Sequence, residues 1–209
     1  NMIIRNIKSK YLPHVYRFLQ QNQSHFNRPL VLDTMISCAG ASTCQLGLCL
    51  SRGAASAVIE ALSKSDLPLD QLAAVKIHFS GCPNSCGQHP LADIGFYGKA
   101  GRQGGHVYPA YNIVAGAVIR EGATQLSSTV GEVSAKDLPQ LLIDVLTEYS
   151  KNPLREDETY WQTDGKQAIL KSVHAHKDMP LFEADKNYYI DWGATDVFSL
   201  AGRGTGECS

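Results

Sequence analysis

The chain of 209 residues lacks several features that mark common functional classes. It has no run of about eighteen apolar residues, which a membrane-spanning helix requires, and its first residues lack a secretory pattern. Its charge is nearly balanced, with 19 basic and 20 acidic residues, so no surface for a polyanion is expected. We therefore expect a soluble, cytoplasmic protein with reduced thiols that binds neither nucleic acid nor a membrane.

Cysteines separated by two residues, which are usual in small iron–sulfur carriers, are also absent. Four of the six cysteines instead form two pairs: Cys38 and Cys44 with five residues between them, and Cys82 and Cys86 with three. Zinc knuckles usually place paired ligands two to four residues apart, so the first gap is too long for one. An iron–sulfur cluster is larger than a single ion and accepts wider spacings. The spacing therefore favours a four-iron cluster over zinc.

Small and turn-forming residues surround both pairs. Gly81 and Gly87 flank the second pair, and Pro83 and Asn84 between its cysteines suit a turn whose amides face inorganic sulfide. Cys82 and Cys86 stand at i and i+4, so one helical turn would point both sulfurs the same way, whereas the first pair requires a loop. We interpret the two pairs together as one site.

Hydrophobic periodicity predicts an α+β fold with a mixed or antiparallel sheet and helices packed on it. The first cysteine pair is expected after one strand and the second pair after another. Cys49 is expected to pack within a helix rather than to act as a fifth ligand. The expected helices cover residues 7–22, 46–63, 134–150 and part of 156–176, and the expected strands cover 30–36, 73–79, 92–97 and 106–118, with a glycine-rich turn at 99–105.

The motifs resemble a known family at this point. The first pair, then the second pair inside Gly-Cys-Pro-Asn-Ser-Cys-Gly-Gln (81–88), followed by Ala-Asp-Ile-Gly-Phe-Tyr-Gly (92–98), is similar to the sirohaem and 4Fe-4S domain of nitrite and sulfite reductases. The stretches 109–116 and 130–133 are similar to later parts of that domain. The resemblance covers residues 30 to 150 approximately.

The resemblance implies a function and a set of site residues. Cys38, Cys44, Cys82 and Cys86 would bind a 4Fe-4S cluster, and the Cys86 sulfur would also be the axial ligand of the sirohaem iron. The other residues expected at the cofactor are Asn84, Gln88 and Thr43. The implied reaction is the six-electron reduction of nitrite to ammonia or of sulfite to sulfide. A structural zinc module and a haem-free electron-transfer protein remain as alternatives.

The resemblance also suggests how the chain is organised. We expect a helical lead-in over 1–29, the cofactor-binding domain over 30–152, and a helical appendage with an extended tail over 153–209. In the family the cysteines lie in the second half of a longer chain, and the first half carries many of the basic residues that hold the anion. The implied partners are therefore that first half, a small anion as substrate, and an electron donor such as ferredoxin or a reductase subunit. This chain alone is expected to be inactive.

Overall fold

The computed structural model describes residues 4–22, 28–151 and 157–201. Their helices are α1 (Leu12–Asn22), α2 (Leu30–Asp33), α3 (Ser51–Ser63), α4 (Leu138–Ser150), α5 (Asp157–Tyr160) and α6 (Asp164–Ala175). Their strands are β1 (Ile36–Ser37), β2 (Ile77–Ser80), β3 (Ile94–Gln103), β4 (His106–Ala115) and β5 (Ser128–Ser134). None of these helices is long and apolar enough to cross a membrane.

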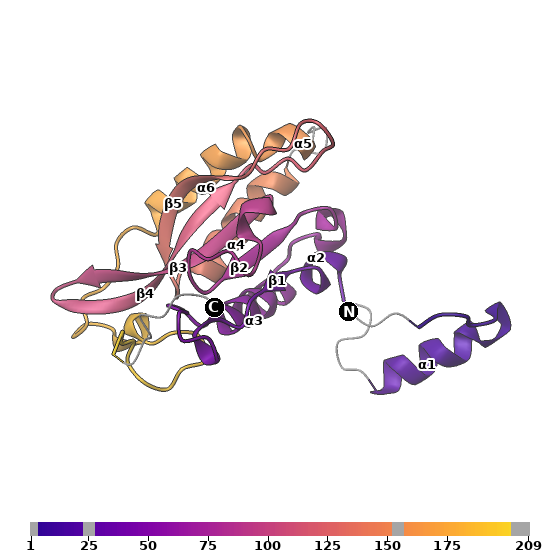
Figure 1. The fold of residues 1–209 in the computed structure, drawn as a ribbon, viewed down its shortest axis with the longest axis horizontal. Coiled ribbons are helices and arrows are strands. Elements are labelled where there is room, and N and C mark those ends of the chain that lie inside the picture. The colour runs from indigo at the N-terminus through magenta and orange to yellow at the C-terminus, as the bar shows by residue number, and fades with distance from the viewer. Residues whose placement is uncertain (1–3, 23–27, 152–156, 202–209) are drawn as a thin grey trace.

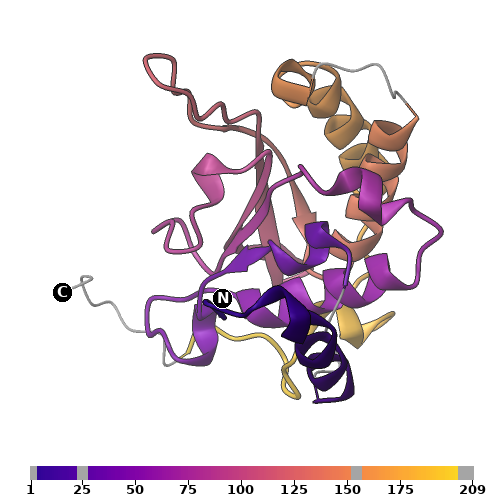
Figure 2. The same cartoon turned by 90° about the vertical axis from the view of Figure 1, so that its right-hand side faces the viewer.

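The strands form one mixed sheet in the order β1-β2-β3-β4-β5. The first three strands pair in parallel, and the last three pair antiparallel. The expected mixed α+β fold is confirmed. Helices α3, α4 and α6 lie on the same side of the sheet, while the segment after the second cysteine pair lies on the other side (Figure 2).

The hydrophobic core lies between the sheet and these helices. Helix α3 presents Ala54, Val58 and Leu62 to it at helical spacing, and the core strands contribute Phe79 and Phe96, whose rings stack at 5.0 Å. Residues of α6 and the aromatic side chains before it join the same core as α4. Helix α1 buries no side chain and is drawn apart from the sheet in Figure 1. The three-part division of the chain stays a prediction.

Several expected elements differ from the observed ones. A strand was expected over 30–36, but residues 30–33 are helical and the strand begins only at Ile36. Pro29, directly before Leu30, favours the start of a helical turn over an extended backbone. The helix expected from residue 46 begins at Ser51, which places Cys49 in the loop before it. Strand β3 continues to Gln103, so the expected turn at 99–105 shrinks to Gly104 and Gly105, both with positive φ.

Two further differences concern the second half of the chain. Strand β5 was not expected at all, since its glycine-containing sequence has no clear alternation of apolar residues. The segment expected to be helical over 156–176 is divided into α5 and α6, with a break before Asp164. The expected helix up to Ser150 is confirmed, although it begins at Leu138. The glycine-rich tail at 202–208 lies outside the described residues.

Candidate metal centre

The two cysteine pairs follow neighbouring parallel strands. Cys38 comes directly after β1, and Cys82 comes two residues after β2. Because parallel strands end at the same edge of a sheet, both loops begin side by side. The Cys38 amide donates a hydrogen bond to the Phe79 carbonyl at 3.1 Å, which continues the β1–β2 ladder into the first loop. The sheet itself therefore brings the two pairs together.

Backbone contacts join the two loops. The Gly81 carbonyl accepts hydrogen bonds from the amides of Leu48 and Cys49, each at 2.9 Å. A Cβ atom on Gly81 would stand 2.7 Å from the Gly40 Cα and 2.8 Å from the Cys49 carbonyl oxygen. Distances this short leave room only for glycine at position 81. Glycine is therefore needed here so that the two cysteine loops can touch.

The Cys38 sulfur already accepts one hydrogen bond and lies beside a hydroxyl. The Gly81 amide donates to Cys38 Sγ at 3.1 Å, and Ser51 Oγ lies 3.3 Å from the same sulfur. Ser51 Oγ also donates to the Cys38 carbonyl at 2.9 Å. These contacts hold the Cys38 sulfur in a fixed position beside the second loop.

Cys82 shows that the four thiols share one environment. It is 9% exposed, and burial raises the pKa of its thiol. A backbone hydrogen bond from Asn84 opposes that rise, while the neighbouring charges of Cys38, Cys44 and Cys86 add to it. All three other thiols therefore lie within electrostatic range of Cys82. Cys44 and Cys86 are exposed, so the group opens to the surface.

These thiols fit an iron–sulfur cluster in number and in donor type. Four thiolates are the usual ligand set of a 4Fe-4S cluster, and amides directed at sulfur are the usual support of that set. Within residues 4–22, 28–151 and 157–201, no three or more His, Cys, Asp or Glu side chains are gathered as ligands of a single metal ion. The structure brings the two pairs to one place, and their role as ligands stays a prediction.

The loop between Cys82 and Cys86 is not the helical turn that their spacing suggested. Ser85, between the two cysteines, has a positive φ of 62°, which no right-handed helix contains. The loop reverses direction instead, and Cys86 Sγ contacts the Asn84 carbonyl at 3.9 Å. The expected helical turn is therefore wrong, because the left-handed backbone at Ser85 interrupts any helical hydrogen bonding between the two cysteines.

A buried polar cluster fixes the end of this loop. Ser80 Oγ in β2 accepts a hydrogen bond from the Gly87 amide at 3.1 Å and pairs with Nδ1 of His89 at 2.8 Å. His89 is buried and stacks on the Tyr97 ring at 4.8 Å, and His78 Nδ1 lies 2.9 Å from the Gln88 carbonyl oxygen. Burial and then the charge of His78 lower the pKa of His89 to about 4, so its ring is neutral at pH 7. We name Ser80, His89, Tyr97 and His78 the Ser80 cluster.

The remaining expected cofactor contacts lie near the thiols at the surface. Thr43, Asn84 and Gln88 have exposed side chains, and the Asn84 amide is the one that bonds to the Cys82 sulfur. Their contact with a cofactor stays a prediction. Cys49 is fully buried in the hydrophobic core and its thiol donates to the carbonyls of Lys99 and Ala110, which confirms that it packs inside the protein.

Sequence reasoning missed Ser51 and the Ser80 cluster. Ser80 and His78 alternate with Ile77 and Phe79 in β2, and this alternation was the available signal that one face of the strand is polar. For His89 the sequence held no signal, because a histidine in a loop is ordinarily exposed. Only its packing on Tyr97 makes it part of the site.

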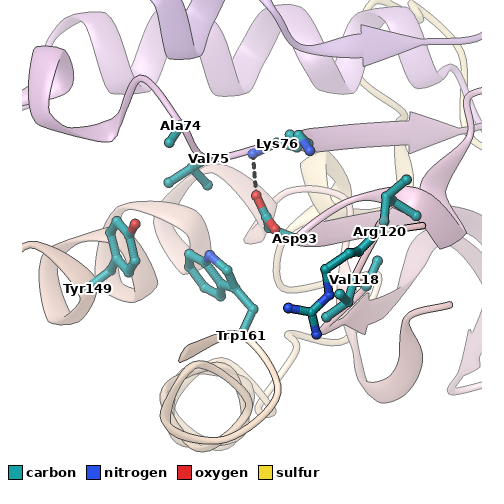
Figure 3. Close-up of a pocket in the computed structure, with 10 residues that line it drawn as sticks. Ala74, Val75, Lys76, Asp93, Val118, Arg120, Tyr149 and Trp161 are labelled. Carbon is teal, nitrogen blue, oxygen red and sulfur yellow. Dashed lines mark hydrogen bonds between the residues drawn. The ribbon is translucent and has the colours of Figure 1, made fainter. Parts of the chain in front are cut away.

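A cavity of about 180 Å³ lies elsewhere, at the opposite ends of β2 and β3 (Figure 3). Its lining includes Lys76 and Asp93, which directly precede these strands, together with Arg120 and Trp161. The Lys76 amide donates to the Asp93 carboxylate at 2.8 Å. Since the cysteines follow β2 and this cavity precedes it, the two sites are separate.

The structure is similar to solved reductases. It matches the Mycobacterium tuberculosis NirA protein with a TM-score of 0.66 and 19% identity, over 79% of this chain and 32% of that one. It matches dissimilatory sulfite reductase I with a TM-score of 0.57 and 13% identity, over 83% of this chain and 61% of that one. The mixed sheet and its helices therefore have the domain fold of nitrite and sulfite reductases.

Sequence comparison leads to the same group of proteins. The chain is 34% identical over 113 residues to a ferredoxin–nitrite reductase of Synechococcus elongatus and 32% identical over 120 residues to one of Leptolyngbya laminosa. These alignments cover 54% and 57% of this chain but 22% and 23% of the relatives. A ferredoxin-linked sulfite reductase of Mycobacterium tuberculosis is 31% identical over 83 residues, which are 39% of this chain and 14% of that one. No family model matches the chain.

Fold and sequence together place this chain in the nitrite and sulfite reductase family. The chain spans less than a quarter of the length of the two nitrite reductases named above.

Proposed function

We propose that this chain is the cofactor-binding part of a sirohaem-dependent nitrite or sulfite reductase. Cys38, Cys44, Cys82 and Cys86 would hold a 4Fe-4S cluster, and Cys86 would share its sulfur with the sirohaem iron. The observation that carries the proposal is the direct contact of the two cysteine loops at Gly40 and Gly81, which gathers four thiols from distant parts of the sequence.

When bound, the two cofactors would supply one-electron steps that sum to the six-electron reduction of nitrite or sulfite. The residues of this chain hold and orient them. The amides of Gly81 and Asn84 donate to the sulfurs of Cys38 and Cys82, which orients these two side chains. The Ser80 cluster fixes the backbone directly after Cys86, through the Gly87 amide and His89. The Cys86 sulfur would thereby keep a fixed position.

The exposure of Cys44, Cys86 and Asn84 suits a site that another part of the enzyme covers. We propose that this other part of the enzyme supplies cations for the substrate anion and for the cofactor carboxylates. The names of the relatives favour ferredoxin as the electron donor. Nitrite and sulfite are both small anions, and the proposal includes either of them as the substrate.

The proposal is tested by loading the chain anaerobically with iron and sulfide. We expect about four iron and four acid-labile sulfide ions per chain, the content of one 4Fe-4S cluster. Replacing Cys38, Cys44, Cys82 or Cys86 by Ser, one at a time, should lower both contents. Cys49→Ser is the matched control, because a serine hydroxyl can donate to the same two carbonyls that the Cys49 thiol contacts.

Three results would speak against the proposal. Zinc bound without sulfide would favour a structural module. A cluster that binds with no change of its spectrum when sirohaem is added would favour a haem-free electron carrier. Loss of iron in Cys49→Ser together with a normal cluster in Cys86→Ser would show that the ligand assignment is wrong.

A further inference from the structure

A buried carboxyl group from the last part of the chain lies at the start of helix α3. Asp191 is 3% exposed, and its Oδ2 atom accepts a hydrogen bond from the Leu50 amide at 2.7 Å. Its Oδ1 atom accepts the Trp192 amide at 2.8 Å. Burying a carboxylate is costly unless hydrogen bonds compensate it, and here each oxygen receives one.

The Leu50 amide is held by a distant residue because its own helix cannot hold it. Leu50 is the residue that precedes α3 and caps its N-terminus. In a capping box, an acidic side chain on the third residue of the helix accepts the amide of the capping residue. The third residue of α3 is Gly53, which has no side chain. Asp191 supplies the missing carboxylate at the positive end of the helix.

Gly53 also makes room for the segment that carries Asp191. A Cβ atom on Gly53 would stand 1.9 Å from the Trp192 carbonyl oxygen, so only glycine allows the two backbones to approach this closely. Trp192 anchors the segment on the loop before α4. Its Nε1 atom donates to the Ala135 carbonyl at 2.5 Å, and the Lys136 ammonium lies 4.1 Å from its ring centroid. The carboxyl group of Asp191 is thus held in place from both sides.

The Leu50 amide lies between two residues that contact the cysteine loops. Before it, the Cys49 amide donates to the carbonyl of Gly81 at 2.9 Å, directly before the second cysteine pair. After it, Ser51 Oγ donates to the Cys38 carbonyl at 2.9 Å and lies 3.3 Å from the Cys38 sulfur. A group that fixes the backbone at Leu50 therefore fixes the contacts to both loops.

We propose that Asp191 is a positioning residue of the metal centre, whose carboxylate holds the backbone at Leu50 so that the two cysteine loops keep the arrangement that binds a cluster. The inference rests on the function proposed above. It extends the site beyond residues 30–150, on which the resemblance of the sequence motifs rests. Asp191 acts through Leu50 and is not a ligand of the cluster.

The test measures how fast the loaded chain loses its cluster to an iron chelator. In Asp191→Ala the Leu50 amide has no acceptor, and we expect loss of the cluster about tenfold faster than in the unmodified chain. Asp191→Asn keeps one oxygen for two amides, so the rate should rise about threefold. This partial rescue by the similar side chain follows from the hydrogen bond.

Ile169→Ala is the matched control for a general loss of stability. Ile169 is fully buried in helix α6, which packs on α4 and β5. Its truncation should lower the midpoint of urea unfolding at least as much as Asp191→Ala does, because it leaves a cavity in the core. The rate of cluster loss in Ile169→Ala should nevertheless stay within about twofold of that in the unmodified chain, since its cysteine loops keep their contacts.

Hydrogen exchange in the cluster-free chain gives a second readout. The amides of Cys49 and Leu50 should exchange about tenfold faster in Asp191→Ala, relative to the amides of helix α6. Unchanged exchange at both amides would overturn the inference. So would a rate of cluster loss within about twofold of the unmodified chain in Asp191→Ala, or in Asp191→Asn if the alanine variant does not fold, and so would equally fast loss in Ile169→Ala. Failure of the unmodified chain to bind any cluster would instead refute the proposed function.

Discussion

Gly81 lies against Gly40, so close that a Cβ atom on Gly81 would stand 2.7 Å from the Gly40 Cα. This contact joins a loop that follows β1 to a loop that follows β2, 41 residues further along the chain. Gly40 itself has a φ of 62°, which favours glycine for a second reason. The two cysteine pairs meet because neither residue carries a side chain.

Gly81→Ala should therefore separate the two loops. The added methyl group meets backbone atoms on two sides, and those cannot move aside as a flexible side chain would. We expect a loss of about 1–3 kcal/mol in the free energy of unfolding and a lower iron content after loading. Urea unfolding and iron analysis measure both effects.

Gly105→Asn is the control for this prediction. Gly105 lies in the β3–β4 turn with nothing within 4 Å of an added Cβ, and asparagine tolerates its positive φ of 81°. Its iron content should match that of the unmodified chain. A normal iron content in Gly81→Ala would mean that the contact between the loops does not assemble the site.

Ser80→Ala should loosen the loop that carries Cys86. The substitution leaves the buried Gly87 amide without its acceptor and removes the partner of His89. We expect a cost of about 1–3 kcal/mol in unfolding free energy and faster loss of the cluster to a chelator. Ser80→Thr keeps the hydroxyl and should restore both properties. Unchanged stability and unchanged cluster retention in Ser80→Ala would mean that the hydroxyl has no role.

His89 should make the stability of the fold depend on pH. Its pKa is about 4 in the folded protein, below the usual value of 6.5, so the unfolded chain binds more protons between these values. Stability should therefore be full above pH 6.5 and decline as the pH falls toward 4. In His89→Asn the amide can replace Nδ1 without titrating, and the decline should be shallower. Thermal unfolding at pH 4 to 7 compares the two chains, and parallel curves would refute this assignment.

The loaded chain alone should reduce neither nitrite nor sulfite at a rate near that of a complete enzyme. The loss of one preorganised electrostatic contact commonly lowers a rate about a hundredfold or more, and a substrate anion needs several. An assay with reduced viologen measures the rate of nitrite and sulfite reduction. It is run with and without a separate chain that carries the part of the enzyme proposed to supply the cations. Rapid turnover by residues 1–209 alone would place the whole anion site within this chain.

The sequence by itself determined the elements that depend on local patterns. The periodic apolar residues of α4 predict its helix, and the spacing of the cysteines with their flanking glycines distinguishes them from Cys49. A strand before each cysteine pair was also expected, although both strands begin later than their sequences suggested. Local chemistry was sufficient here because each signal lies within a few residues of the feature that it predicts.

Only the tertiary structure decided how these parts act together. Residues that are distant in sequence form the Gly40–Gly81 contact, and the chain must fold back to pack His89 on Tyr97. Strand β5 exists because β4 offers it hydrogen bonds, since its own sequence has no regular alternation of apolar residues. Burial set the pKa of His89, and burial is a property of the whole fold that no local pattern of residues contains.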